Sequence, residues 1–226
     1  MTRPAPHSVE SGHLAQRYCW LLVGIALNSF AIALITKSAL GTSPISSLPY
    51  VCSLAFPSIS FGAATFALNM LFIVAQIVLL RHDFEPVQLL QIAVNVVFSY
   101  LIDFSGDVLL SWYAPPMLAM QLVGLIAGCA LLALGIVIEI APHVIVVPGE
   151  GIVRALAAVT QRPFGSIKVV FDVTLVVLAA LLALASMGTI TGLGAGTVIS
   201  ALLVGRFCNL WTRFCTPIER IRDLTR

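Results

Sequence analysis

The chain has 226 residues, of which 59% are hydrophobic and only 10% are charged, and its formal net charge is +2. Soluble domains carry about 25% charged residues, and the mean hydropathy of this chain is +1.03. A water-soluble fold of this length could not bury so much apolar surface, so we expect an all-α membrane protein. The small net charge gives no basis for nucleic-acid binding.

Along the chain, six segments are long enough to cross a bilayer, which takes about 20 helical residues. These predicted spans are Tyr18–Thr36, Gly62–Leu80, Val87–Phe104, Pro116–Ile140, Gly165–Ala185 and Thr189–Leu210. The polar residues 1–17 precede the first span, and the basic residues 211–226 follow the last. We expect both stretches to be cytoplasmic tails.

Two further helical segments are too short to span, and they occupy equivalent places between spans. They are Ser43–Phe56 and Pro148–Thr160, and Pro44 and Pro148 suit the first turn of a helix. Short segments interrupted by Gly or Pro at matching positions favour a binding site near the midplane of a transporter. The alternative is an amphipathic helix lying at the membrane interface, and the sequence leaves both readings open.

The chain also contains an internal duplication. Gly24, Ala31 and Pro44 recur as Gly128, Gly135 and Pro148 at a spacing of 104, and Phe61, Gly62 and Asn69 recur as Phe164, Gly165 and Asp172 at 103. Asp103 near the end of the first copy corresponds to Asn209 in the second. We therefore predict two membrane repeats, residues 18–104 and 122–210, joined by an extracytoplasmic turn and the start of the fourth span at 105–121.

The basic residues predict the orientation of these spans. With six crossings, all of the following fall on one side: Arg3, Arg17, Arg81, Arg154, Arg162, Arg206, Arg213, Arg220, Arg222 and Arg226. The opposite loops carry only Lys37. This positive-inside pattern places both termini in the cytoplasm. Three spans in each repeat start the second repeat on the opposite side, so the repeats are predicted to be inverted, each with a short broken or re-entrant helix.

No enzyme is predicted. The five cysteines stand singly and form no CxxC or His/Cys pattern, so neither a disulfide framework nor a metal site is indicated. The chain has no HExxH, GxSxG or Walker motif and no His/Asp cluster in a span. We expect no catalytic residues, cofactor or metal.

Several motifs in order resemble one family. The residues Ala39–Pro44 with Leu48-Pro49, Val147–Ile152, Phe164-Gly165 with Lys168 and Asp172, and Gly194–Ile199 with Gly205 are similar to segments of the YczE/YyaS/YitT-type bacterial membrane proteins. The similarity runs from about Tyr18 to Asn209. It departs at Ala195, where some relatives are expected to carry an acidic residue. The resemblance implies a multi-pass protein of the bacterial inner membrane and supplies no substrate.

Ionisable groups within spans are costly and are candidates for function. Asp172 lies about two turns into the fifth span, and Lys168 at i−4 can pair with it on one helix face. Asn69 is the equivalent of Asp172 in the first repeat. A binding role stands beside structural readings, in which Lys168 snorkels with a paired Asp172 and Asn69 only joins helices.

Glu150 is the second charged candidate. It follows Gly149 in the first turn of the short segment 148–160, where the helix dipole favours a carboxylate, and Arg154 at i+4 can balance its charge. Ser43 and Pro44 are the counterparts in the first repeat. A helix cap with a charge pair is the alternative. Glu139 is expected to reach water at the cytoplasmic end of the fourth span.

These residues predict a small polar cavity between the repeats, lined by Ser43, Pro44, Asn69, Gly149, Glu150, Asp172 and Thr197, with Lys168 and Arg154 balancing charge. The predicted function is transport of a small solute, with the bilayer as environment. A substrate-capturing subunit of a larger transporter and a non-transporting membrane scaffold or regulatory protein are the alternatives, and a homo-oligomer is compatible with each.

Overall fold

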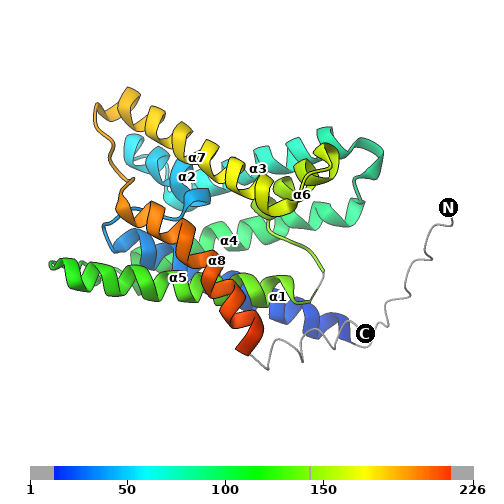
Figure 1. The fold of residues 1–226 in the computed structure, drawn as a ribbon, viewed down its shortest axis with the longest axis horizontal. Coiled ribbons are helices and arrows are strands. Elements are labelled where there is room, and N and C mark those ends of the chain that lie inside the picture. Colours follow the sequence, from blue (N-terminus) through cyan, green and yellow to red (C-terminus); the bar gives the residue numbers. More distant parts are fainter. Residues whose placement is uncertain (1–12, 143, 215–226) are drawn as a thin grey trace.

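A computed structural model describes residues 13–142 and 144–214, and this part of the chain is all-helical. Its elements are the α-helices α1 (Leu14–Lys37), α2 (Pro44–Ala55), α3 (Phe61–Leu80), α4 (Gln91–Phe104), α5 (Leu118–Ile140), α6 (Pro148–Thr160), α7 (Phe164–Met187) and α8 (Ala195–Phe214), with 3₁₀ segments η2 (Arg81–Asp83) and η3 (Pro86–Leu90) and the π-helical segment η4 (Ser105–Leu109). Figure 1 shows the helices running roughly along the long axis of the molecule.

Five helical segments of the described chain are long and apolar enough to cross a membrane. They are Leu14–Lys37, Phe61–Asp83, Pro86–Leu109, Leu118–Ile140 and Phe164–Met187. These five correspond to the first five predicted spans, so the protein has the helices of a multi-pass membrane protein. The sixth predicted span corresponds to α8, which is not among the five and carries Arg206, Asn209 and Arg213 in its second half.

The ends of the helices follow local chemistry. Pro44 and Pro148 occupy the first positions of α2 and α6, where a missing backbone N–H costs nothing. Gly188 ends α7 in the left-handed conformation, at φ 70°, which only glycine adopts without strain. The prediction began the last span at Thr189, whereas residues 189–194 form a loop and α8 begins at Ala195.

The predicted tails fall mostly outside the described residues. Residues 1–12 and 215–226 are not described. The remaining parts of both tails are helical, because α1 already begins at Leu14 and α8 continues to Phe214.

Helices α1 and α5 form the central pair, and they contact each other in a reciprocal way. A Cβ atom on Gly24 of α1 would lie 2.7 Å from the backbone nitrogen of Glu139 in α5. A Cβ atom on Gly128 of α5 would lie 2.6 Å from Cγ1 of Ile35 in α1. Gly24 and Gly128 are separated by 104 positions, as are Ile35 and Glu139. The two helices therefore pack antiparallel with equivalent residues in equivalent contacts.

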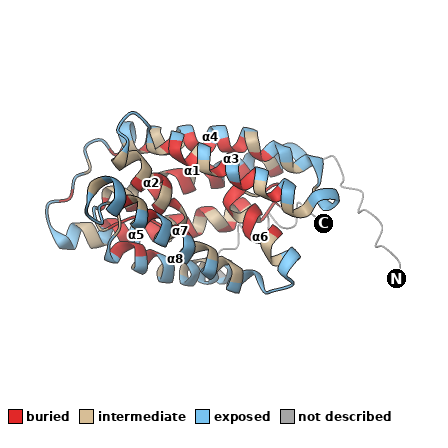
Figure 2. Ribbon diagram, turned by 90° about the horizontal axis from the view of Figure 1, so that it is seen from above, coloured by how far each residue is buried: buried red, intermediate tan, exposed pale blue. Residues whose placement is uncertain are grey.

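The other helices divide into two groups that mix the two halves of the sequence. In one group α4 packs on α1 and α8 packs on α5, so that α4 and α8 flank the central pair. In the other group α2 packs on α7 and α3 packs on α6. Figure 1 shows the second group, with α2, α3, α6 and α7, above α1, α5 and α8. Figure 2 shows buried residues gathered along the facing sides of the helices and exposed residues on their outer faces.

The two groups are joined on one side by α3 and α4. The backbone N–H of Gly62 donates to Oδ1 of Asp103 at 2.6 Å, and the hydroxyl of Ser60 donates to Oδ2 of the same carboxylate at 2.6 Å. Deeper along the pair, the side-chain amides of Gln76 and Gln91 bond reciprocally at 3.2 Å. The helices α3 and α4 are thus held together at both ends.

Candidate functional site

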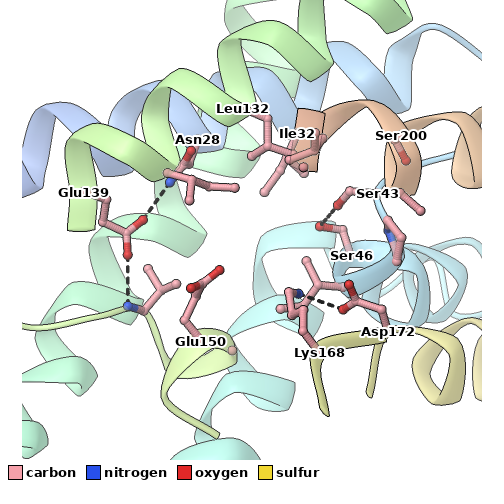
Figure 3. A pocket seen from close by; sticks show the side chains of 18 of the residues that line it. Asn28, Ile32, Ser43, Ser46, Leu132, Glu139, Glu150, Lys168, Asp172 and Ser200 are labelled. Atoms are coloured by element: carbon pink, nitrogen blue, oxygen red, sulfur yellow. Dashed lines mark hydrogen bonds and ion pairs between the residues drawn. The ribbon is translucent and has the colours of Figure 1, made fainter. Parts of the chain in front are cut away.

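A cavity of about 450 Å³ lies between the two helix groups. Small-molecule sites usually measure about 300–1,000 Å³, so this volume suits one small solute. Its wall is largely apolar and includes Ile32, Phe98, Leu132, Ile136 and Val204. Figure 3 shows the labelled polar side chains converging on it from two sides, with Asn28, Glu139 and Glu150 on one side and Ser43, Ser46, Lys168 and Asp172 on the other.

The first turns of the two short helices meet at this cavity. Ser43, Pro44 and Gly149 line it and are buried. A Cβ atom on Gly149 would collide with Cδ1 of Ile45, so the first turn of α6 lies directly against the Ile45 side chain of α2. The hydroxyl of Ser43 donates to the hydroxyl of Ser46 at 2.9 Å. The structure therefore brings the beginnings of α2 and α6 together inside the protein.

Lys168 and Asp172 form the ion pair of α7 at the cavity wall. The distance from Nζ of Lys168 to Oδ1 of Asp172 is 2.8 Å, and both side chains are about a quarter exposed. Asn69 of α3 also lines the cavity and is 6% exposed. Its Nδ2 donates to Oδ1 of Asn95 at 2.8 Å, while its own carbonyl oxygen accepts no hydrogen bond from the described residues. Asn69 and Asp172, equivalent in the sequence, thus line one cavity.

Glu150 extends from the first turn of α6 into the cavity (Figure 3). Its carboxylate forms no hydrogen bond or ion pair with another described residue, so it is available to a ligand. Arg154, expected to balance it, is exposed, does not line the cavity and forms no ion pair with Glu150. The i+4 spacing puts both residues on one face of α6, but Arg154 stands one turn beyond Glu150, exposed and outside the cavity.

Glu139 was expected to reach water, and this prediction is wrong. Glu139 is 2% exposed and lines the cavity. Its Oε2 accepts a hydrogen bond from Nδ2 of Asn28 at 2.7 Å, and its Oε1 accepts one from the backbone N–H of Val147 at 3.0 Å. Because Val147 immediately precedes α6, Glu139 ties α1, α5 and the start of α6 together. A glutamate at the end of a span looks solvated in sequence, and its burial depends on tertiary contacts with Asn28 and Val147.

Thr197 lies outside the lining of the cavity. It is 4% exposed, and its hydroxyl accepts a hydrogen bond from the backbone N–H of Thr42 at 3.3 Å. The backbone N–H of Gly196 donates to the carbonyl of Leu40 at 2.8 Å. The first turn of α8 is therefore docked on the turn that precedes α2. One helical turn further on, Ser200 replaces Thr197 as the residue of α8 that lines the cavity.

Sequence reasoning missed Asn28, Ser46 and Ser200 as lining residues. One signal for Ser46 was present, because Ser46 stands 104 positions before Glu150, as Pro44 stands before Pro148. Asn28 corresponds to Leu132 at the same spacing, so the duplication gave no polar counterpart for it.

The rim of the cavity is made by α7 and α8 alone. Four residues of its lining are exposed, Phe164 and Val169 on α7 and Ala201 and Gly205 on α8. Every other lining residue is buried or half-buried. The cavity therefore opens to the outside between α7 and α8, on a face that includes one of the five candidate membrane spans.

The model of the family of unknown function DUF6198 matches residues 15–213. The chain belongs to this family. The match covers every helix that builds the cavity, from α1 to α8, so the site is a feature of the DUF6198 part of the chain. Comparison with curated proteins and with solved structures gives no match. The resemblance to the YczE/YyaS/YitT-type proteins stays a prediction.

Proposed function

We propose that this DUF6198 protein is a transporter or permease for a small solute, which binds in the cavity between the two helix groups. The observation that carries the proposal is an asymmetry between two equivalent helix pairs. One pair, α3 and α4, is closed, while its counterpart, α7 and α8, borders the opening of the cavity. A transporter must have a site that opens to one side at a time, and repeats in different states provide this.

The closed pair depends on close packing at one glycine. A Cβ atom on Gly62 would collide with the carbonyl oxygen of Ser99 and would lie 2.5 Å from Oδ2 of Asp103. Glycine is therefore required here for α3 to reach α4, and Asp103 then caps the start of α3.

The open pair carries the corresponding residues without the corresponding contacts. Gly165 is the counterpart of Gly62, and Gly205 and Asn209 stand 106 positions after Ser99 and Asp103. A Cβ atom on Gly165 or on Gly205 would have no heavy atom within 4 Å. Asn209 is exposed, and its side chain makes no hydrogen bond with the described residues. Two unconstrained helical glycines are explained if α7 closes on α8 in a second state, as α3 closes on α4.

The proposal includes six crossings in two inverted repeats, with α2 and α6 as re-entrant helices and both termini in the cytoplasm of a bacterium. The antiparallel, reciprocal packing of α1 and α5 supports the inversion. A two-fold axis that relates two antiparallel helices is perpendicular to them, and for helices that cross the membrane such an axis lies in the membrane plane, as inverted repeats require. The buried first turns of α2 and α6 support re-entrant helices, since irregular backbone at membrane depth must face protein or a wet cavity.

Accessibility labelling tests the orientation. In a chain without native cysteines, a single cysteine at His82 is expected to be protected from impermeant reagent in whole cells, whereas one at Ser111 is expected to react. The opposite result at either position would refute the six-span topology.

Transport itself is tested by crosslinking α7 to α8 across the opening of the cavity. Ser60, the residue before α3, bonds to Asp103 of α4 in the closed pair. The equivalent positions in the open pair are Pro163, the residue before α7, and Asn209 of α8. Cysteines are therefore introduced at both, as Pro163→Cys and Asn209→Cys. Proteoliposomes are incubated with a mixture of metabolites, and mass spectrometry identifies what accumulates compared with protein-free liposomes. We expect at least one solute to accumulate, and oxidation of the cysteine pair to stop this reversibly. Accumulation of nothing, or accumulation unaffected by the crosslink, would overturn the proposal.

A further inference from the structure

We propose that the solute is an organic amine, a cation that carries N–H donors on an apolar body. This inference rests on the proposed function, because it names the class of solute for the same cavity. It comes from three independent properties of the lining: its charge, the balance of hydrogen-bond donors and acceptors, and the position of its apolar surface.

The charge of the lining is negative. Two half-buried carboxylates line the cavity, those of Glu150 and Asp172, against the single ammonium group of Lys168. The third acidic side chain of the lining, Glu139, is buried and already hydrogen-bonded through both oxygens, so it is not counted here. Lys168 is already committed to Asp172 at 2.8 Å. The nearest further cations in sequence, Arg154 and Arg206, are exposed and do not line the cavity. A cationic solute is therefore favoured over an anionic one, and the apolar wall strengthens this preference by lowering the local dielectric.

The polar atoms left without a partner are hydrogen-bond acceptors. The Glu150 carboxylate points into the cavity (Figure 3), and Asp172 makes its ion pair through Oδ1, so that its Oδ2 has no partner among the described residues. The carbonyl oxygen of Asn69, a residue that is 6% exposed, also lacks a donor among the described residues. The carbonyl oxygen of Asn28, another residue of the lining, is buried without a hydrogen-bond partner among the described residues, and a buried acceptor without a donor is costly. An ammonium group supplies several donors at once, whereas a carboxylate or a quaternary ammonium supplies none.

The apolar surface lies where the body of an amine would rest. Ile32, Leu132 and Ile136 form the wall on the side of α1 and α5, and Phe164 and Val169 stand at the rim between α7 and α8. A solute whose amine meets Glu150 and Asn69 can therefore extend its apolar part along this wall. Water-soluble inorganic cations would leave this surface uncovered.

Two natural cysteines provide a direct test of the cavity charge. Cys208 lines the cavity, whereas Cys19 is exposed on α1 and does not. In chains that retain only one of them, we expect the ratio of reaction rates for cationic and anionic methanethiosulfonate reagents to be on the order of tenfold higher at Cys208 than at Cys19. Glu150→Gln should reduce that excess, and Glu85→Gln, in an exposed loop, should not. Equal ratios at both cysteines would overturn the proposal.

Binding of a matched set of probes tests the solute class. Phenethylammonium, 2-phenylethanol and phenylacetate share one shape and differ in charge. We expect only the ammonium compound to raise the melting temperature of the purified protein, and Glu150→Gln to remove most of this shift while Glu85→Gln preserves it. Stabilisation by phenylacetate, or stabilisation by the amine that does not depend on Glu150, would overturn the proposal.

The two proposals can fail separately. If the proteoliposomes accumulate a solute that is not an amine, transport stands and the solute class is wrong. If amines bind in a Glu150-dependent way and no solute accumulates, the class stands and the protein is not a transporter.

Discussion

The carboxylate of Asp103 accepts a hydrogen bond of 2.6 Å from the backbone N–H of Gly62, whereas the equivalent residues Asn209 and Gly165 make no such contact. One helix junction is therefore sealed by a residue type that the other lacks. A carboxylate accepts two bonds here, from Gly62 and from Ser60, while a neutral amide would hold the same junction more weakly. The two halves of the sequence thus differ in chemistry at the place where their packing differs.

The first prediction concerns this junction. Asp103→Ala removes both acceptors at the start of α3, and we expect it to lower the free energy of unfolding by about 2 kcal/mol. Asn209→Ala is the matched control and should change stability little. Thermal unfolding in detergent measures both. Equal losses in the two variants would show that Asp103 does not seal the junction.

The second prediction concerns Glu139. Glu139→Ala leaves the backbone N–H of Val147 and the amide of Asn28 without their acceptor and creates a cavity beside Gly24, so we expect a loss of about 3 kcal/mol. Glu150→Ala removes a carboxylate that no described residue contacts, and it should leave stability nearly unchanged. The melting temperatures of the two variants make the comparison. A larger loss for Glu150→Ala would contradict the assigned roles.

Much of the fold could be predicted from the sequence, because lipid imposes strong length and hydropathy constraints on helices. The first five predicted spans and both short segments agree with the structure to within a few residues. The start of α8 was predicted six residues early, since Thr189 to Gly194 read as apolar enough to continue a helix while Gly192, at φ 86°, needs a turn. The duplication also indicated several residues that line the cavity, because Pro44 in the first half of the sequence and Asn69 with its counterpart Asp172 all line it.

The rest depended on tertiary structure. Glu139 is buried by tertiary contacts with Asn28 and Val147, which its neighbours in the sequence do not indicate. Arg154 was expected to pair with Glu150, but i,i+4 spacing only permits a pair, and Arg154 is exposed outside the cavity that Glu150 lines. Ser200 lines the cavity in place of Thr197, because the first turn of α8, with Thr197, packs on the turn at Thr42. Helical periodicity alone does not determine which side of a helix faces a cavity.

The third prediction concerns the gap between α7 and α8. Gly205→Leu adds a side chain where nothing lies within 4 Å, so the protein should fold with its normal melting temperature. The added side chain would stand where α7 must approach, and we expect uptake into proteoliposomes to be lost. Gly106→Leu, also at a glycine with no neighbour within 4 Å, is the control and should transport normally. Normal uptake by the Gly205→Leu variant would contradict closure of α7 on α8.

The last prediction uses the sign of a charge change at the ion pair of α7. Lys168 competes with a cationic solute for Asp172, because its ammonium group lies 2.8 Å from Oδ1. Lys168→Met removes this competitor while keeping a long, flexible side chain, so we expect phenethylammonium to bind on the order of tenfold more tightly, whereas Asp172→Asn should weaken binding by a similar factor. Calorimetric titration of the purified variants measures both. If instead the pair is only a structural element, both substitutions should lower the melting temperature and change amine affinity in the same direction, and that result would remove Asp172 from the site.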